Sequence, residues 1–120
     1  MKYFFDCEFI EFKKPVKFMG FKLEEINTIN LISIGIVCED GREFYAESAD
    51  FHIANAEANT WLKENVLANL KKSEDQRWSN DMIAANIRVF IEPFHDDKPE
   101  FFGYFCDYDW VVFCWLFGRM

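Results

Sequence analysis

Residues 2–10 read KYFFDCEFI, and this stretch decides the class of fold. Its side chains alternate between two faces, as a β-strand requires. One face carries Tyr3, Phe5, Cys7 and Phe9, and the other carries Phe4, Asp6, Glu8 and Ile10. A strand that is apolar on both sides does not hold two carboxylates without a reason, because burying an unpaired charge is costly. The stretch therefore predicts a strand with one apolar face and one face that carries two carboxylates with a specific role.

The rest of the chain predicts an α/β domain around this strand. Apolar runs predict further strands at 30–38, 42–48 and 101–106, and residues 11–28 predict a long loop or an extended hairpin. Helical spacing predicts helices at 55–70, 80–92 and 110–117, the last opened by residues 107–109. Ser79 or Asn80 can cap the second helix, and Gly118 can end the third. Three antiparallel strands, a helical crossover and a fourth strand parallel to the first make a mixed sheet.

Length and charge restrict the class of protein. A chain of 120 residues with 51% hydrophobic residues predicts one domain with its own core. The 13 Lys and Arg against 21 Asp and Glu give a net charge of −8. This charge argues against a protein that grips nucleic acid with a broad basic face. It does not argue against an enzyme that meets phosphate through divalent metals.

The cysteines and the hydropathy pattern predict a cytoplasmic protein with no membrane partner. No two cysteines form a C-x-x-C pair, so we expect buried, reduced thiols at Cys7, Cys38, Cys106 and Cys114. The first apolar stretch is interrupted by acids, which a signal peptide does not tolerate. The longest apolar run, at 110–117, is too short for a bilayer core of about 30 Å.

Asp6 and Glu8 form the most informative pair of residues. Two-residue spacing on a strand places both carboxylates on one face, about 7 Å apart. Acids in an apolar setting repel each other and lose hydration, and a divalent cation such as Mg²⁺ or Mn²⁺ relieves both costs. The alternative is that this face of the strand is exposed and its acids are simply hydrated.

Asp109 favours the metal interpretation. It lies where the fourth strand passes into the last helix, and a parallel fourth strand would bring it close to Asp6. Asp107 is the runner-up acid, and its alternative role is to cap the last helix. Asp40 is expected in a tight turn and Asp96-Asp97 in a solvated loop, so we assign them no role.

These residues carry a resemblance to a known family. Residues 3–11 resemble motif I, D-x-E, of the DEDD 3′–5′ exonucleases, and most closely the RNase AS family of polyadenylate-specific ribonucleases. Residues 31–46 are similar to the hairpin that follows in that family. Residues 103–109, followed by Trp110 and Gly118, resemble its motif II, in which an aromatic-Asp step matches Tyr108-Asp109. The resemblance covers nearly the whole chain apart from residues 12–26, which look like an insertion.

The resemblance implies an RNase H-like fold and two Mg²⁺ or Mn²⁺ ions. It implies hydrolysis that releases 5′-mononucleotides from the 3′ end of single-stranded RNA, with DNA as a possible second substrate, and it implies a homodimer. By this resemblance Asp6 bridges both metals, Glu8 binds the ion that activates water, and Asp109 binds the other. Phe9 is a candidate to stack on the terminal base, and its alternative role is core packing.

The chain departs from the family at motif III, a His followed five residues later by an Asp. His52 and His95 do not match it, and we interpret both as histidines of surface loops. Three explanations stay open. The 120 residues are a fragment, which we favour, or a degenerate member that binds nucleic acid or a nucleotide without cutting, or a chain completed by another chain. A third class of function is a protein-interaction domain that docks a partner on its apolar face.

Overall fold

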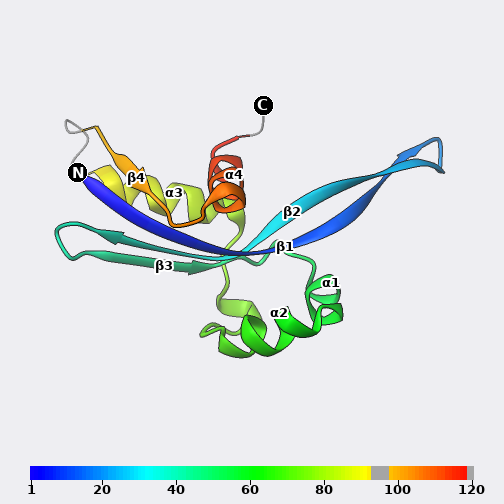
Figure 1. The fold of residues 1–120 in the computed structure, drawn as a ribbon, viewed down its shortest axis with the longest axis horizontal. Coiled ribbons are helices and arrows are strands. Elements are labelled where there is room, and N and C mark those ends of the chain that lie inside the picture. Colours follow the sequence, from blue (N-terminus) through cyan, green and yellow to red (C-terminus); the bar gives the residue numbers. More distant parts are fainter. Residues whose placement is uncertain (93–97, 119–120) are drawn as a thin grey trace.

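The computed structural model describes residues 1–92 and 98–118. The strands within this range are β1 (Lys2–Phe18), β2 (Phe21–Cys38), β3 (Glu43–Glu47) and β4 (Glu100–Phe102). The α-helices are α1 (Ile53–Ala58), α2 (Thr60–Asn65), α3 (Asn80–Ile91) and α4 (Asp107–Leu116), with short 3₁₀ helices η1 (Leu67–Asn69) and η2 (Glu74–Gln76). The sheet forms a central layer, with α3 and α4 on one side and α1 and α2 on the other (Figure 1).

The sheet has the predicted mixed topology. Its strand order is β3-β2-β1-β4, with β2 antiparallel to both β1 and β3. Strand β4 lies parallel to β1 and pairs with Lys2, Tyr3 and Phe4 alone. Three antiparallel strands with a parallel fourth confirm the predicted α/β class and agree with an RNase H-like fold.

A bulge in β2 sorts the apolar residues between the two faces of the sheet. Glu8 pairs with Ser33 but Phe9 pairs with Leu31, so Ile32 is an extra residue without a partner on β1. Leu31 and Ile34 consequently face the same core, while Ile32 joins the core on the opposite face. Because of the bulge, β2 contributes side chains to the hydrophobic cores on both faces of the sheet.

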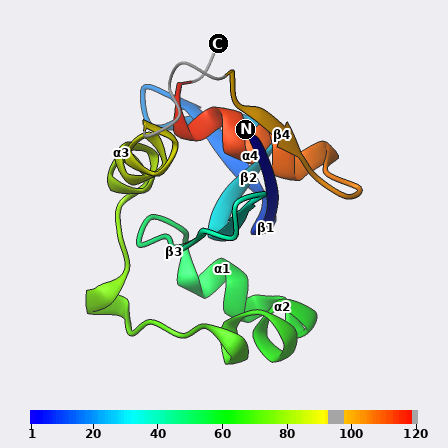
Figure 2. The ribbon, with the colours of Figure 1, turned by 90° about the vertical axis from the view of Figure 1, so that its left-hand side faces the viewer.

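The two cores differ in size and in how much of the sheet they cover. The larger core lies under α3 and α4 and includes Tyr3, Phe5, Cys7, Ile34, Ile36, Ile83, Ile87, Val112, Phe113 and Leu116. The smaller core lies under α1 and α2 and contains Ile10, Ile32, Phe51, Ala56, Leu62 and Val66. On that second face Phe4 is 49% and Val37 46% exposed, so the sheet beside Asp6 is not covered. Figure 2 shows α1 and α2 apart from α4, with the sheet between them.

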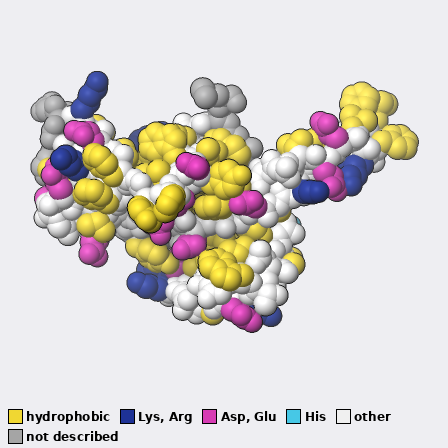
Figure 3. Space-filling model, in the orientation of Figure 1, with side chains coloured by type: hydrophobic (Ala, Val, Ile, Leu, Met, Phe, Trp, Pro, Cys, Tyr) yellow, Lys and Arg dark blue, Asp and Glu magenta, His cyan; other side chains and the backbone are white. Residues whose placement is uncertain are grey.

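Residues 11–28 form the extended hairpin, which we call the arm. Strands β1 and β2 stay paired out to Phe18 and Phe21. The turn between them places Met19 at φ 51° and Gly20 at φ 83°, the left-handed geometry of a tight hairpin. The arm extends away from the body in Figure 1, and Figure 3 shows its tip as an apolar cluster. The loop alternative was therefore wrong.

Two predicted elements differ from the structure. The predicted strand at 101–106 ends at Phe102, because Phe105 adopts a left-handed φ of 46° and the chain turns there. Gly103 permits the turn, since a Cβ at this position would lie 2.5 Å from the Cys106 Cβ. The predicted helix at 55–70 is broken at Asn59, whose backbone is extended and whose side chain accepts a hydrogen bond from the Leu62 N–H. Asn favours such a cap over a helix interior.

Smaller predictions are confirmed or corrected as follows. Ser79 caps α3 by accepting from the Met82 N–H, and Gly118 has a left-handed φ of 134° just after α4. All four cysteines are free, but Cys106 and Cys114 are only half-buried, so the prediction of full burial was wrong for these two. No helix in the described part of the chain combines the length and hydropathy that crossing a bilayer needs.

Candidate functional site

The site begins where β4 ends along the edge of β1. Strand β4 covers that edge only as far as Phe4, and beyond it the Cys7 N–H donates a hydrogen bond of 2.8 Å to Asp109 Oδ1. Asp109 lies in the first turn of α4 and is 8% exposed. Helix α4 is anchored by Val112, Phe113 and Leu116 in the larger core. The fold therefore brings Asp109 to the edge beside Asp6, as the sequence predicts.

The Asp6 and Asp109 carboxyls are direct neighbours. Loss of hydration, the charge of Asp109 and a hydrogen bond between the two carboxyls raise the pKa of Asp6, and the Cys7 N–H opposes this shift. Two carboxyls can share a hydrogen bond only while one of them holds a proton. With both ionised the pair is repulsive, which is the situation that a bound cation relieves.

Glu8 completes the acidic group. It shares a face of β1 with Asp6, as the two-residue spacing predicts, and both line one groove. Glu8 is half-buried, and loss of hydration followed by the charges of Asp6 and Asp109 raises its pKa. The charge of Asp109 thus acts on both Asp6 and Glu8, and the charge of Asp6 acts on Glu8.

The groove of about 280 Å³ beside these acids separates the sheet from the segment after α2. Its floor is formed by Asp6, Glu8, Ser33 and Gly35, and its walls by Tyr45, Asn65, Val66, Asn69, Leu70 and Lys71. A second, more apolar groove of about 550 Å³ lies between Phe4 and Val37 of the sheet and Phe102 to Tyr104. Asp6 lines both grooves, so it stands where the two meet.

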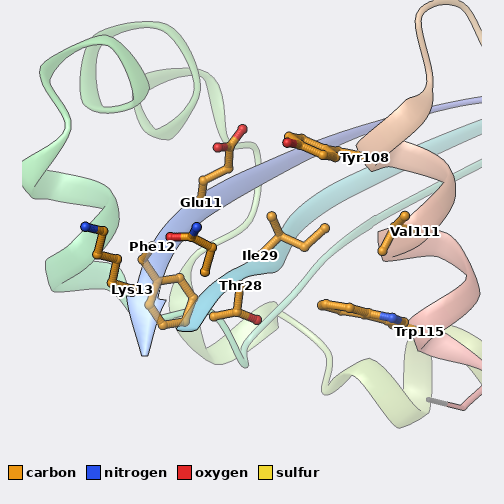
Figure 4. A pocket seen from close by; sticks show the side chains of 9 residues that line it. Glu11, Phe12, Lys13, Thr28, Ile29, Tyr108, Val111 and Trp115 are labelled. Atoms are coloured by element: carbon orange, nitrogen blue, oxygen red, sulfur yellow. The ribbon is translucent and has the colours of Figure 1, made fainter. Parts of the chain in front are cut away.

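A third groove lies on the other face of the sheet, between the base of the arm and α4. In Figure 4 the arm contributes Glu11, Phe12, Lys13 and Thr28, the adjoining part of β2 contributes Ile29, and α4 contributes Tyr108, Val111 and Trp115. Its volume is about 510 Å³. Tyr108, which lines this groove, also contacts Phe9 edge-on, with the two ring centroids 5.9 Å apart. Phe9 also packs partly against the larger core, so its role in base stacking stays a prediction.

Asp107 takes a different position from Asp109. It is exposed in the first turn of α4, and the N-cap of that helix is Cys106, so the predicted capping role was wrong. The charge that raises the pKa of Asp6 is that of Asp109, and the charges that raise the pKa of Glu8 are those of Asp6 and Asp109; Asp107 contributes to neither. Among the other acids, Asp40 accepts from the Arg42 backbone in the predicted turn. Asp96-Asp97 and His95 lie outside the described residues.

Glu47 is an organising residue that the sequence did not reveal. Its buried carboxylate accepts from Tyr45 Oη at 2.6 Å, from the Lys71 N–H at 2.7 Å and from the Lys72 N–H at 3.1 Å. Arg77 Nε lies 3.4 Å away. Burial works against ionisation, but these donors outweigh it and hold the pKa of Glu47 below its usual value. No local signal in the sequence distinguishes Glu47, the last residue of β3, from Glu43, the exposed acid at the start of the same strand.

The acids fit a metal in their chemistry. Carboxylate oxygens that repel one another at a partly dehydrated edge are the donors that Mg²⁺ and Mn²⁺ prefer. Across residues 1–92 and 98–118, however, no group of three or more His, Cys, Asp or Glu side chains is arranged to hold a metal ion. The assignment of Asp6, Glu8 and Asp109 as ligands therefore stays a prediction, which the raised pKa values of Asp6 and Glu8 beside Asp109 support.

Comparison with known proteins finds similarity over the whole chain. No family model matches the sequence. The chain is 36% identical over 121 aligned positions to proteins of two strains of Mycobacterium tuberculosis, CDC 1551 / Oshkosh and ATCC 25618 / H37Rv, each named a 3′–5′ exoribonuclease. The alignment covers 100% of this chain and 63% of each relative, so the chain spans less than two thirds of their length.

A further similarity is more local. The chain is 35% identical over 81 residues to a cadmium, zinc and cobalt-transporting ATPase of Helicobacter pylori (strain ATCC 700392 / 26695). This alignment covers 67% of the chain but 12% of the ATPase. A match to so small a part of that protein says nothing about transport by this chain.

Proposed function

We propose that the chain is a member of the family of these 3′–5′ exoribonucleases and forms a metal-dependent exoribonuclease domain that acts on the 3′ end of single-stranded RNA. The observation that carries the proposal is the junction of Asp6 with Asp109, fixed by the hydrogen bond from the Cys7 N–H to Asp109 Oδ1. Glu8 extends this acidic group into a groove that is open to a substrate.

Asp6, Glu8 and Asp109 would hold two Mg²⁺ or Mn²⁺ ions, which supply an activated water and stabilise the leaving oxygen of the phosphodiester. The protein's own contribution is position. Asp109 is held at the edge of β1 by the Cys7 N–H. Asp6 stands where two grooves meet, so it can face a phosphodiester that lies across the junction. We propose 5′-mononucleotides as products.

The substrate that we propose is a single strand. The groove beside the acids offers Tyr45, Asn65 and Lys71, which can contact a base, a ribose and a phosphate. Apolar Phe4 and Phe102 line the groove on the other side of Asp6, and their stacked rings can face a base. RNA is the first choice because the relatives are named exoribonucleases, and DNA is the alternative.

The general base and the fourth acid that the family implies are not assigned to residues of this chain. His52 is exposed at the N-cap of α1, and we give it no part in the reaction. We propose that both groups come from sequence outside these 120 residues or from a second chain. A second candidate function follows from the same fact: without those groups the domain binds nucleic acid or a nucleotide and does not cut it.

Location and assembly are proposals as well. Free thiols at all four cysteines support a reducing compartment, and we propose the cytoplasm. A homodimer stays a prediction from the resemblance to the exonuclease family.

The test is degradation of a 5′-labelled single-stranded RNA by the protein in its full natural length. We expect a ladder that shortens from the 3′ end in Mn²⁺ or Mg²⁺ and is absent in EDTA. Asp6→Asn should lower the rate by at least about 100-fold, while Asp107→Asn should stay within about threefold of wild type. An Asp6→Asn protein as active as wild type would refute the assignment, and a metal-independent ladder would refute the mechanism. RNA binding without cleavage would favour the inert module.

A further inference from the structure

One wall of the groove beside the acids has the composition of a nucleotide subsite. The Tyr45 ring is 38% exposed and lines the groove together with Lys71. The Lys71 ammonium lies 5.2 Å from the centroid of that ring, a cation–π contact. Asp6 and Glu8 lie on the floor of the same groove. An aromatic face and a cation therefore stand together next to the acids.

This wall is held in place by a buried group. Glu47 is 2% exposed and accepts from both members of the pair, from Tyr45 Oη at 2.6 Å and from the Lys71 N–H at 2.7 Å. The Lys72 N–H donates to the same carboxylate. Because the ring and the lysine backbone are fastened to one carboxylate, their relative position is set before a ligand arrives. A surface lysine on a solvated loop has no such anchor.

The chemistry of the wall matches a single strand of nucleic acid. Ammonium groups contact phosphate as point charges, and an aromatic face stacks on any base. The chain carries a net charge of −8, and the floor of the groove is acidic, so a polyanion needs a local cation to approach. Lys71 supplies one within the groove itself.

We propose that Tyr45 and Lys71 form a subsite for the nucleotide next to the scissile position. The Tyr45 ring stacks on its base, and the Lys71 ammonium binds a backbone phosphate. Glu47 is a positioning residue that aligns both. This inference rests on the proposed function and specifies where the strand lies relative to Asp6 and Glu8.

The test uses the full-length protein and a short labelled single-stranded RNA, with binding measured in EDTA over a series of salt concentrations and kinetics measured in Mn²⁺. Lys71→Ala should weaken binding about fivefold and reduce the slope of log affinity against log salt by about 0.7, the value for one phosphate contact on a single strand. Tyr45→Leu should weaken binding about tenfold with the slope unchanged, and Tyr45→Phe, which keeps the aromatic face but loses the hydrogen bond to Glu47, should weaken it by a smaller factor. Each loss should appear in KM, with kcat within about threefold. Lys63→Ala, an exposed lysine of α2 that does not line the groove, is the matched control.

The outcomes separate this inference from the proposed function. If the wild-type protein degrades RNA while Lys71→Ala and Tyr45→Leu keep its KM and salt slope, the subsite is wrong and the exonuclease proposal stands. If Lys63→Ala loses as much affinity as Lys71→Ala, the charge effect is general and the subsite is again wrong. If the wild-type protein neither binds nor degrades RNA, both proposals fail together.

Discussion

Asp109 serves the fold and the candidate site through the same carboxylate. It is buried, which is costly for an acid without partners, and it accepts from the Cys7 N–H at 2.8 Å. That bond fastens the first turn of α4 to the edge of β1. It also leaves the carboxylate against Asp6, where it influences the ionisation of that residue.

Replacing Asp109 with Ala and with Asn should separate these two roles. Asp109→Ala leaves the Cys7 N–H without its acceptor, and we expect a loss of about 1–3 kcal/mol in the free energy of unfolding. Asp109→Asn keeps an oxygen for that bond and should lose less than about 1 kcal/mol while losing metal-dependent activity. Urea denaturation with a parallel nuclease assay measures both. Equal stability losses in the two variants would contradict the assigned role of the hydrogen bond.

Asp6 should destabilise the metal-free protein at neutral pH. The pKa of Asp6 is higher in the folded protein than its ordinary value of 3.8. Asp6 therefore does not lower the free energy of unfolding at a pH below 3.8, but it does so increasingly as the pH rises through the folded-state pKa. Asp6→Asn should therefore raise stability in EDTA at pH 7 by up to about 1 kcal/mol, since its side chain is exposed and partly screened. The difference from wild type should vanish in acid. An Asn variant that is less stable than wild type at pH 7 would show that Asp6 is not under repulsion.

The positions of the acids followed from the sequence better than their contacts did. Alternation along residues 2–10 was enough to place Asp6 and Glu8 on one face, and the parallel fourth strand was enough to bring Asp109 near Asp6. The bond to Cys7 could not be predicted, because it depends on β4 ending at Phe102 and leaving the edge of β1 open. Tertiary contacts of this kind carry no local sequence signal.

Strand β3 and the segment after η1 are joined by one buried carboxylate. Glu47 accepts from the N–H groups of Lys71 and Lys72, so a wall of the groove depends on a residue of the sheet. The connection explains why a segment without regular helix keeps a defined position beside Asp6 and Glu8.

Replacing Glu47 should therefore lower the free energy of unfolding more than replacing an exposed acid would. Glu47→Ala should lower the free energy of unfolding by about 3 kcal/mol, because several partly buried donors lose their acceptor. Glu43→Gln, an exposed position on the same strand, is the control and should change stability by less than about 0.5 kcal/mol. Urea denaturation of both variants is the measurement.

The pH dependence of Glu47 runs opposite to that of Asp6. The pKa of Glu47 is lower in the folded protein than its ordinary value of 4.5. Its contribution to the free energy of unfolding is therefore fully present above pH 4.5 and is lost as the pH falls through the folded-state pKa. Wild-type stability should fall more steeply in acid than that of Glu47→Gln. Parallel curves for the two proteins would contradict an ionised, stabilising Glu47.

Most elements could be predicted from pattern, and the exceptions have local causes. The strands at 30–38 and 42–48 and the helix at 80–92 follow strong periodicity. The helix predicted at 55–70 failed because Asn59 caps a new helix instead of continuing the first. The bulge at Ile32 could not be predicted, because the sequence of a continuous apolar run does not indicate which face of the sheet each residue occupies.

The whole molecule combines a compact body with an arm that adds little to its core. At the tip of the arm the exposed fractions are 63% for Phe18, 81% for Met19 and 75% for Phe21. The tip is therefore a contiguous apolar surface exposed to solvent at the end of a projecting hairpin (Figure 3).

Replacing Phe18 and Phe21 together with Ser should change the free energy of unfolding by no more than about 1 kcal/mol, because both side chains are already in water. Binding of a hydrophobic dye to the folded protein should decrease. Phe5→Ser, at a position 5% exposed in the larger core, should cost about 3–5 kcal/mol and is the contrast. A large stability loss from the double substitution at the tip would show that the arm packs on the body.

We propose that Asp6, Glu8 and Asp109 form one metal site, and calorimetric titration of the protein with Mn²⁺ measures this binding without a further reaction. It needs neither RNA nor a general base. Wild-type protein should bind Mn²⁺, and Asp6→Asn, Glu8→Gln and Asp109→Asn should each weaken binding by at least about tenfold, while Asp107→Asn should bind like wild type. Wild-type affinity in all three site variants, or a loss confined to Asp107→Asn, would contradict the assignment.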